Sequence, residues 1–277
     1  MNALLGVDLG GTNVRVGLVQ NSKVSHIQSN RIDASGSQQE VLGEIETLLD
    51  KIFSPEVSGI GIGVPSVVDI ERGIVYDTLN IPSWNEVPLK SILERRFHVP
   101  VFINNDANCF VLGESHFGKA RGYRNAAGMV VGTGLGTGLI LNGQLYSGNH
   151  CGAGEFGVVP YRDGILENYA SGQFFQRIYG VTGEALAKRA SRGDGEAGRI
   201  FDEFGLVLGD AIQLVMYAVD PDIIVLGGSV SRDFQYFESS LRKSLDKFLY
   251  QRAALALKIE VSDIEHVAIL GAAALCL

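Results

Sequence analysis

Hydrophobic residues follow two recurring patterns along the chain. Short apolar runs that end at glycine, proline or polar residues are typical of buried strands. They occur in segments 3–8, 14–20, 58–69, 99–106, 128–143 and 222–231. Longer segments with apolar residues three or four positions apart predict amphipathic helices. These segments are 40–53, 88–97, 107–118, 198–219, 234–249 and 265–277.

The order of these elements predicts an α/β protein, because strands and helices alternate along the chain. Segments 3–20 and 128–143 each read as an apolar strand, a turn rich in glycine and threonine, and a second apolar strand. They open the two halves of the chain in the same way, which is a weak sign of internal duplication. No low-complexity tract interrupts the pattern.

Composition and charge narrow the classes of function. The 277 residues carry a net charge of −8, which disfavours a nucleic-acid partner because phosphate backbones bind basic surfaces. The three cysteines form no CxxC pair, as expected in a reducing cytoplasm. We expect no secretory leader, and the sequence has no apolar run of the roughly 20 residues that a membrane span needs.

Three glycine-rich turns follow predicted strands. Each could be an ordinary hairpin turn without a ligand, or its exposed backbone amides could bind phosphate oxygens. None matches the dinucleotide fingerprint or the Walker loop, so a nucleotide site here needs a different build. Asp8, just before the first turn, could hold Mg²⁺ through water or could cap the turn. The turns are Gly10-Gly11-Thr12, Gly132-Thr133-Gly134 and Gly227-Gly228.

The stretch INNDAN places polar residues between a strand and a helix. Asp106 could act as the N-cap of that helix. It also lies at the carboxyl end of a strand, where α/β folds bind ligands. A carboxylate beside Asn105 suits a polyhydroxylated substrate, since carboxylates accept hydrogen bonds from hydroxyls and amides both donate and accept them.

Six motifs in this order resemble the ROK family of sugar kinases and repressors, over nearly the whole chain. They are DLGGTN, INNDAN, GTGLGTG, AGEFG, LENYASG and DPDIIVLGG. The resemblance implies an actin-like ATPase (ribonuclease H-like) fold, with two α/β domains and a cleft between them. We expect the smaller domain at 1–104 plus 266–277 and the larger at 105–265. Because a predicted strand begins at residue 3, we expect the kinase branch rather than a repressor with an N-terminal DNA-binding domain.

The resemblance also implies roles for individual residues. Asp106 matches the catalytic aspartate. Asn80, Asn105, Asp106, Glu155 and Glu167 match sugar-binding positions. The ATP-binding positions are Asp8, Gly10, Gly11, Thr12 and Asn13 in the first turn, Thr133 and Gly134 in the second, and Gly227 and Gly228 on the nucleoside side. ATP and Mg²⁺ are the implied cofactors, with Asp8 holding the ion through water.

The chain departs from the family pattern near the two glutamates. Val158 stands where the family usually has a histidine, and the short loop VVPYRDGI lacks the usual cysteine cluster. Because those residues jointly hold a structural zinc ion in typical members, we expect no zinc site. Sugar preference is affected as well, since the histidine also contacts the sugar ring. Ser66 replaces a common glycine and could alter the pocket wall.

The sequence therefore predicts a cytoplasmic, dimeric, ATP-dependent kinase that phosphorylates the 6-hydroxyl of a glucose-like hexose. One alternative is a kinase for N-acetylmannosamine or N-acetylglucosamine. A second is a sugar-binding regulator without turnover, and a third is an actin-like filament protein. Asp8 and Asp106 disfavour the regulator, and the two glutamates and the short chain disfavour the filament protein.

Overall fold

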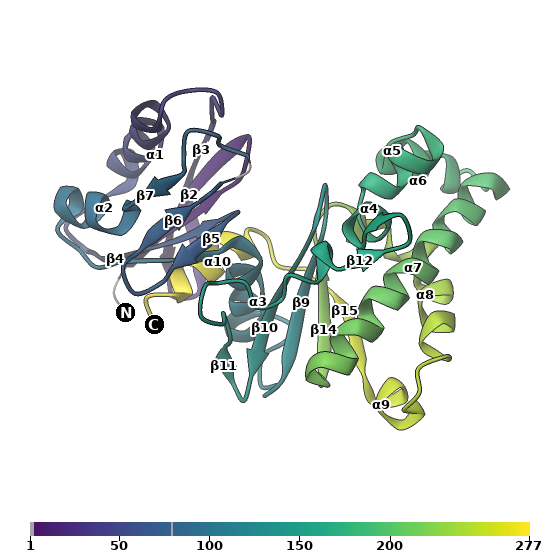
Figure 1. Cartoon of the computed structure of the whole chain (residues 1–277). Coiled ribbons are helices and arrows are strands. Elements are labelled where there is room, and N and C mark those ends of the chain that lie inside the picture. The colour runs from purple at the N-terminus through teal and green to yellow at the C-terminus, as the bar shows by residue number, and fades with distance from the viewer. Residues whose placement is uncertain (1–2, 79) are drawn as a thin grey trace. The chain divides into compact units, whose positions relative to one another are not determined.

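The computed structural model describes residues 3–78 and 80–277 and is a mixed α/β structure. The chain forms two compact units (Figure 1). The first comprises residues up to Arg121 together with Leu145–Ala153 and Asp263–Leu277. The second comprises Gly122–Gln144 and Gly154–Ser262. In the described part of the chain, no helix combines the length and apolar character that crossing a membrane requires.

The first unit is built on a five-stranded sheet in the order β3-β2-β1-β4-β8. Strands β1, β2 and β3 are antiparallel neighbours, whereas β1, β4 and β8 run parallel. The strands are β1 Ala3–Leu9, β2 Asn13–Gln20, β3 Lys23–Arg31, β4 Val57–Val64 and β8 Val101–Asn105. A small sheet contains β5 Val67–Asp69, β6 Ile74–Tyr76 and β7 Glu86–Val87.

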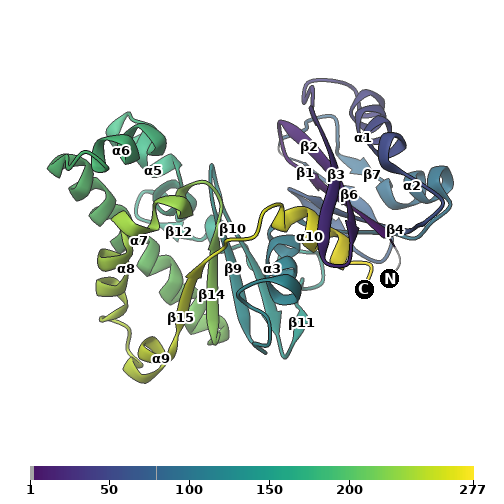
Figure 2. The ribbon, with the colours of Figure 1, turned by 180° about the vertical axis from the view of Figure 1, so that it is seen from behind.

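Helices cover both faces of this sheet (Figures 1 and 2). Helices α1 Gln38–Ile52 and α2 Leu89–Phe97 share one apolar core with the sheet, and Trp84 is fully buried in it. Ser37 and Glu40 form a capping box that fixes the start of α1. On the other face, α10 Val267–Ala274 packs against β1, β4 and α3 Asp106–Phe117.

The packing of α10 depends on glycines in the sheet. A Cβ at Gly61 on β4 would lie 1.7 Å from the carbonyl oxygen of Ala272. Because backbone atoms cannot give way as a flexible side chain can, Gly61→Ala is expected to destabilise the protein by about 3 kcal/mol. A Cβ at Gly43, inside α1, would have no heavy atom within 4 Å, so Gly43→Ala should stabilise by about 0.5–1 kcal/mol. Urea unfolding of both variants measures the difference; equal midpoints would contradict this packing.

The second unit has a five-stranded sheet in the order β11-β10-β9-β14-β15. Its strands are β9 Ala126–Val131, β10 Leu135–Leu141, β11 Gln144–Leu145, β14 Ile223–Gly227 and β15 Lys258–Val261. Helices α4 Glu167–Ala170, α5 Gln173–Tyr179, α6 Gly183–Ala190, α7 Gly195–Val219, α8 Glu238–Leu245 and α9 Gln251–Ala256 accompany it. Short 3₁₀ helices η1 Phe156–Val158 and η2 Val230–Tyr236 and the hairpin β12 Pro160–Tyr161 and β13 Gly164–Ile165 complete it. Its core includes a cluster of phenylalanines from α5, α7 and the start of α8.

The expected helix at 234–249 is wrong in its bounds. The structure has η2 Val230–Tyr236, then α8 Glu238–Leu245. The apolar residues at 237, 241, 245 and 248 do face the core, but Phe237 has φ −127°, which separates the two elements. The domain boundary expected after residue 104 would assign α3 to the second domain, whereas α3 lies in the first compact unit.

Candidate active site

Three parallel strands of the first unit end together at one edge of the sheet. Asp8 on β1 pairs in register with Gly63 on β4, and Gly63 pairs with Asn104 on β8. Asn105 and Asp106 follow Asn104 directly. Asp8 and the INNDAN segment, far apart in sequence, are therefore placed on the same edge, where α/β folds bind ligands.

Asn105, and not Asp106, is the N-cap of α3. The Asn105 Oδ1 atom accepts hydrogen bonds from Ala107 N at 2.9 Å and from Asn108 N at 3.4 Å. The capping role considered for Asp106 is thus taken by its neighbour. Asp106 is the first residue of the helix, half-buried, with its Oδ1 atom accepting from Ala107 N at 2.8 Å. A carboxylate in the first turn is stabilised by the helix dipole.

Asp8 is paired with Arg15. The carboxylate Oδ2 atom accepts from Arg15 Nε at 3.0 Å and also from the Nη2 atom. The hairpin register explains the pair, because Asp8 and Arg15 are directly opposed on β1 and β2. Sequence reasoning missed Arg15, although counting outward from the Gly10-Gly11 turn would have placed it opposite Asp8. Nearly half of the Arg15 side chain is exposed, whereas that of Asp8 is 13% exposed.

The first glycine turn is tight and closely packed. Gly10 N donates to Asn13 O at 2.8 Å, and Asn13 Nδ2 donates to Thr12 Oγ1 at 3.1 Å. A Cβ at Gly11 would lie 2.6 Å from Cβ of Asn80. The structure therefore brings the expected sugar-pocket asparagine against the expected phosphate turn. Thr12, Asn13 and Asn80 are exposed.

Asn104 organises a buried polar cluster that the sequence did not reveal. Its Oδ1 atom accepts from Asn105 N at 2.9 Å, from Asn108 Nδ2 at 2.9 Å and from Cys151 Sγ at 2.9 Å. Its Nδ2 atom donates to Ser147 Oγ at 3.2 Å. Because Asn104 is only 4% exposed, these bonds fix the strand end that carries Asn105 and Asp106.

The other two glycine turns meet at one edge of the second sheet. Gly227 on β14 pairs with Val130 on β9, two residues before Gly132. Gly228 has φ +89°, and a Cβ there would lie 2.3 Å from the carbonyl oxygen of Val131. Only glycine fits this conformation and this spacing, so the close approach of the two turns depends on it.

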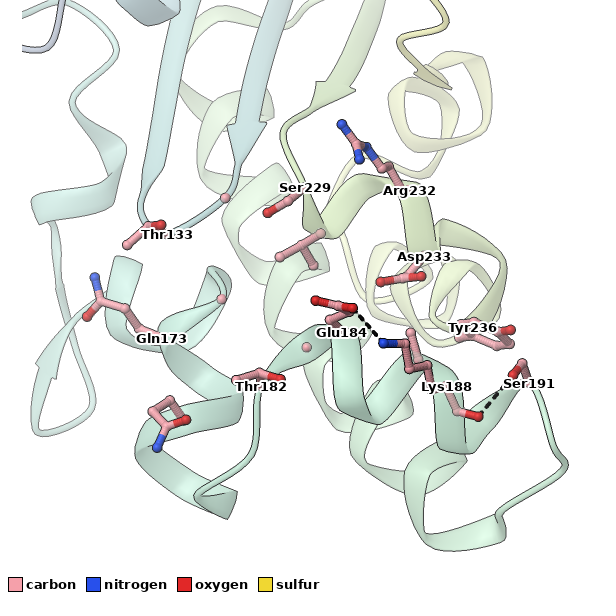
Figure 3. A pocket seen from close by; sticks show the side chains of 16 residues that line it. Thr133, Gln173, Thr182, Glu184, Lys188, Ser191, Ser229, Arg232, Asp233 and Tyr236 are labelled. Atoms are coloured by element: carbon pink, nitrogen blue, oxygen red, sulfur yellow. Dashed lines mark hydrogen bonds and ion pairs between the residues drawn. The ribbon is translucent and has the colours of Figure 1, made fainter. Parts of the chain in front are cut away.

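A pocket of about 870 Å³ opens beside these turns (Figure 3). Gly132, Thr133 and Ser229 contribute the turn side of the pocket. Helices α5, α6 and η2 supply the remaining wall, with Gln173, Thr182, Glu184, Lys188, Arg232, Asp233 and Tyr236 among its residues. Lys188 Nζ lies 2.7 Å from Glu184 Oε1. Burial raises the pKa of Asp233, while the charge of Arg232 opposes that shift.

Glu167 is held against the second glycine turn. Its Oε2 atom accepts from Leu135 N at 2.9 Å, and its Oε1 atom accepts from Gln173 Nε2 at 2.9 Å. A Cβ at Gly134 would lie 2.4 Å from Oε2, so the missing side chain at Gly134 makes room for the carboxylate. Gln173 was not identified from the sequence. Ser171 ties the same segments together by donating to Thr133 O at 3.1 Å and to Glu167 O at 2.7 Å.

Glu155 directly precedes η1 and lies near Glu167. Desolvation of its carboxyl group, and then the negative charge of Glu167, raise the pKa of Glu155. The two glutamates are twelve positions apart in sequence, yet they are close enough to interact electrostatically. Val158, in η1 after Glu155, is 58% exposed.

The expected site residues fall into two groups. Asp8, the first glycine turn, Asn80, Asn105 and Asp106 belong to the first unit. Glu155, Glu167 and the other two glycine turns belong to the second. Across residues 3–78 and 80–277, no three His, Cys, Asp or Glu side chains gather as a metal site.

Several known proteins similar to this chain are sugar kinases. A glucokinase from Thermotoga maritima is 31% identical, covering 98% of this chain and 96% of its own. An N-acetyl-D-glucosamine kinase from Pectobacterium carotovorum is 32% identical, covering 82% of this chain and 83% of its own. A crystal structure of a ROK family glucokinase from Streptomyces griseus with glucose and AMPPNP matches at a TM-score of 0.81, with 25% identity and 98% of each chain covered.

These similarities confirm the actin-like ATPase fold that the motifs implied. The sequence pattern of the ROK family matches residues 4–277. This range includes the three glycine turns, the INNDAN segment and the two glutamates. The chain therefore belongs to the ROK family.

Proposed function

We propose that this ROK family sugar kinase transfers the γ-phosphoryl group of ATP to the 6-hydroxyl of a hexose, with a glucose-like sugar favoured. One observation carries the proposal: Asp106 follows the capping residue Asn105 on the same strand edge as Asp8. This edge offers a carboxylate for the hydroxyl of the sugar and a second carboxylate for a metal–phosphate group.

Asp106 is the proposed catalytic residue. Its carboxylate orients the 6-hydroxyl and accepts the proton as the oxygen–phosphorus bond forms. Because Asn105 satisfies the first amides of α3, the Asp106 side chain does not have to serve as the cap. Asn105 and Asn80 are proposed to bind other hydroxyls of the sugar.

ATP is proposed to bind along the glycine turns. The amides of Gly10, Gly11, Thr12 and Asn13, and those of Thr133 and Gly134, suit phosphate oxygens because no bulky side chains cover the turn glycines. The nucleoside is assigned to the 870 Å³ pocket beside Gly132 and Ser229, next to Gly227 and Gly228. This volume lies in the range of small-molecule sites.

Mg²⁺ fits the residues at the first turn. Asp8 supplies a hard oxygen ligand, and Mg²⁺ commonly uses one or two carboxylates together with water and phosphate oxygens. When bound, the ion neutralises charge on the transferring group. Asp8 is proposed to hold it through water, while Arg15 shares the carboxylate through Oδ2.

Glu155 and Glu167 are proposed to accept hydrogen bonds from hydroxyls of one sugar ring. The second candidate substrate is an N-acetylhexosamine, which the 32% identical N-acetyl-D-glucosamine kinase supports. Val158 also supports it, because a valine is smaller than the histidine that the resemblance implies and leaves more room for a different substituent. We further propose a cytoplasmic homodimer with no membrane partner. We also propose that it has no nucleic-acid partner, in keeping with the net charge of −8.

The raised pKa of Glu155 predicts a pH dependence of sugar binding. As the pH falls, this carboxylate takes up a proton before an ordinary glutamate does, and a protonated carboxyl is a weaker acceptor. KM for the sugar should therefore start to rise at a higher pH than an ordinary glutamate would produce. In Glu167→Gln the rise should begin at a lower pH, because the charge that helps to raise the Glu155 pKa is gone. Profiles of kcat/KM against pH measure this shift, and an inflection at the same pH in both proteins would contradict it.

A coupled assay of ADP release tests the proposed function. The wild-type protein, with ATP and Mg²⁺, is offered glucose, mannose, N-acetylglucosamine and N-acetylmannosamine. We expect turnover with at least one of them and the highest kcat/KM with glucose. A preference for an N-acetylated sugar would select the second candidate. No turnover with any sugar would instead favour a sugar-binding regulator.

A further inference from the structure

The loop between Glu155 and Glu167 is ordered by side-chain contacts. It forms the hairpin β12–β13, in which Pro160 pairs with Ile165 and Tyr161 with Gly164. Leu166 N donates to Val159 O at 2.9 Å and closes the base of the hairpin. The hairpin starts two residues after η1, and α4, which begins with Glu167, starts two residues after its end.

Tyr161 anchors this hairpin to α7. Its hydroxyl donates to Asp210 Oδ2 at 2.7 Å. The other carboxylate oxygen, Asp210 Oδ1, accepts from Ser244 Oγ on α8 at 2.8 Å. Ser244 is 1% exposed and accepts from Gln213 Nε2 at 3.0 Å, so the acceptor of the tyrosine is itself fixed. Burial and the bond to Asp210 raise the pKa of Tyr161 to about 12, because the protonated hydroxyl is the form that donates to the carboxylate.

A second set of contacts joins the tip of the hairpin to α4 and α5. The Arg162 guanidinium lies over the ring of Tyr161, 5.3 Å from its centroid, and over the ring of Tyr169, 5.0 Å from its centroid. Arg177 lies 5.5 Å from the Tyr169 centroid and 3.4 Å from Asp163 Oδ2. The Tyr169 hydroxyl also donates to Asp163. Cation–π contacts and hydrogen bonds thus close the hairpin onto α4.

Arg162 adopts a backbone conformation that favours glycine. Its φ is +52°, in the left-handed region, where a side chain is disfavoured. A glycine at this position would fit the turn with less strain. The side chain therefore compensates for the strain through its contacts with the two tyrosine rings.

Each end of the hairpin is connected to a segment that carries one of the glutamates proposed to bind the sugar. Tyr169, which is 4% exposed, lies two residues after Glu167 on α4. At the other end, Val159 N donates to Phe156 O at 3.2 Å in the turn that follows Glu155. The anchored hairpin therefore restrains the backbone on which both carboxylates are carried.

We propose that the Tyr161–Asp210 bond and the Arg162–Tyr169 contacts position Glu155 and Glu167 for the sugar. Tyr161 and Asp210 are positioning residues, since they act through the hairpin and not on the substrate. This inference rests on the proposed function, because it assigns the two glutamates to the sugar.

Hydrogen exchange of Tyr161→Phe and Asp210→Asn tests the ordering of the hairpin. Phenylalanine keeps the ring beneath Arg162 and removes only the hydroxyl, so the variant should fold. The control is Tyr179→Phe, because the Tyr179 hydroxyl donates to Glu203 Oε2 at 2.5 Å outside the hairpin. We expect faster exchange at residues 155–169 in the first two variants only. Unchanged exchange there would overturn the proposal whether or not the protein is active.

Kinetics of the same variants test the link to the sugar. We expect KM for the preferred hexose to rise about 3- to 10-fold in Tyr161→Phe and Asp210→Asn, with KM for ATP unchanged. The double variant should show little further increase, since both changes act on the same bond: the first removes its donor and the second removes the charge of its acceptor. An unchanged sugar KM alongside faster exchange would also overturn the proposal. If the wild-type protein phosphorylates no hexose, the proposed function fails on its own, and exchange still decides whether the bond orders the hairpin.

Discussion

Asp106→Asn is expected to lower kcat for hexose phosphorylation by about 10²- to 10⁴-fold, the usual contribution of a positioned acid or base. Asparagine has nearly the same shape and keeps an oxygen that can accept from Ala107 N, the bond that Asp106 Oδ1 accepts at 2.8 Å. It cannot take up the proton of the 6-hydroxyl. KM for the sugar and the melting temperature should therefore change little.

The matched control for this variant is Asp194→Asn. Asp194 also lies at a helix start, where it caps α7 by accepting from Glu196 N at 2.9 Å and Ala197 N at 3.2 Å. Its replacement makes the same chemical change away from the proposed site and should leave kcat unchanged. A kcat for Asp106→Asn close to that of the wild type would remove Asp106 from the chemistry.

Glu167→Gln is expected to raise KM for the sugar by about 10- to 100-fold, from the 1.5–3 kcal/mol of a hydrogen bond to a charged group. The carboxylate accepts from Leu135 N through one oxygen and from Gln173 Nε2 through the other. A glutamine side chain has one oxygen and one amide NH2 group, so the NH2 group would face one of these two donors. The substitution therefore removes the charge and disturbs the turn beside Gly134.

Glu203→Gln is the control for this change. Glu203 accepts from the Tyr179 hydroxyl at the surface of α7, so its loss should leave the sugar KM unaltered. Initial rates at saturating ATP over a range of sugar concentrations separate KM from kcat. If Glu167→Gln and Glu203→Gln give the same sugar KM as the wild type, Glu167 does not bind the ring.

Local sequence signals predicted many of the elements. The helix expected at 40–53, the strands expected at 3–8 and 222–231 and the helix expected at 265–277 correspond to α1, β1, β14 and α10. These features depend on neighbours in sequence. The helix expected at 234–249 failed because its apolar spacing continues across the break at Phe237, where the backbone changes conformation but the side chains still reach the core.

The sequence predicted which residues belong to the candidate site, but it did not predict which residues they contact. The glycine turns, the INNDAN segment and the glutamates could be identified because each motif is contiguous. The partners that hold them come from distant segments: Ser147 and Cys151 for Asn104, and Leu135 for Glu167. No local pattern requires a tyrosine in a hairpin to meet Asp210 on a helix 49 residues later.

Phosphorus NMR of the reaction product tests the central claim most directly. The wild-type protein is incubated with ATP, Mg²⁺ and its preferred hexose, and the new phosphomonoester signal is recorded with proton coupling. Phosphate on the 6-hydroxyl is coupled to the two protons of C6, so a triplet is predicted, and Asp106→Asn should give almost none of it. A doublet, which indicates phosphate on a ring hydroxyl, or no sugar phosphate from any hexose would contradict the proposed transfer.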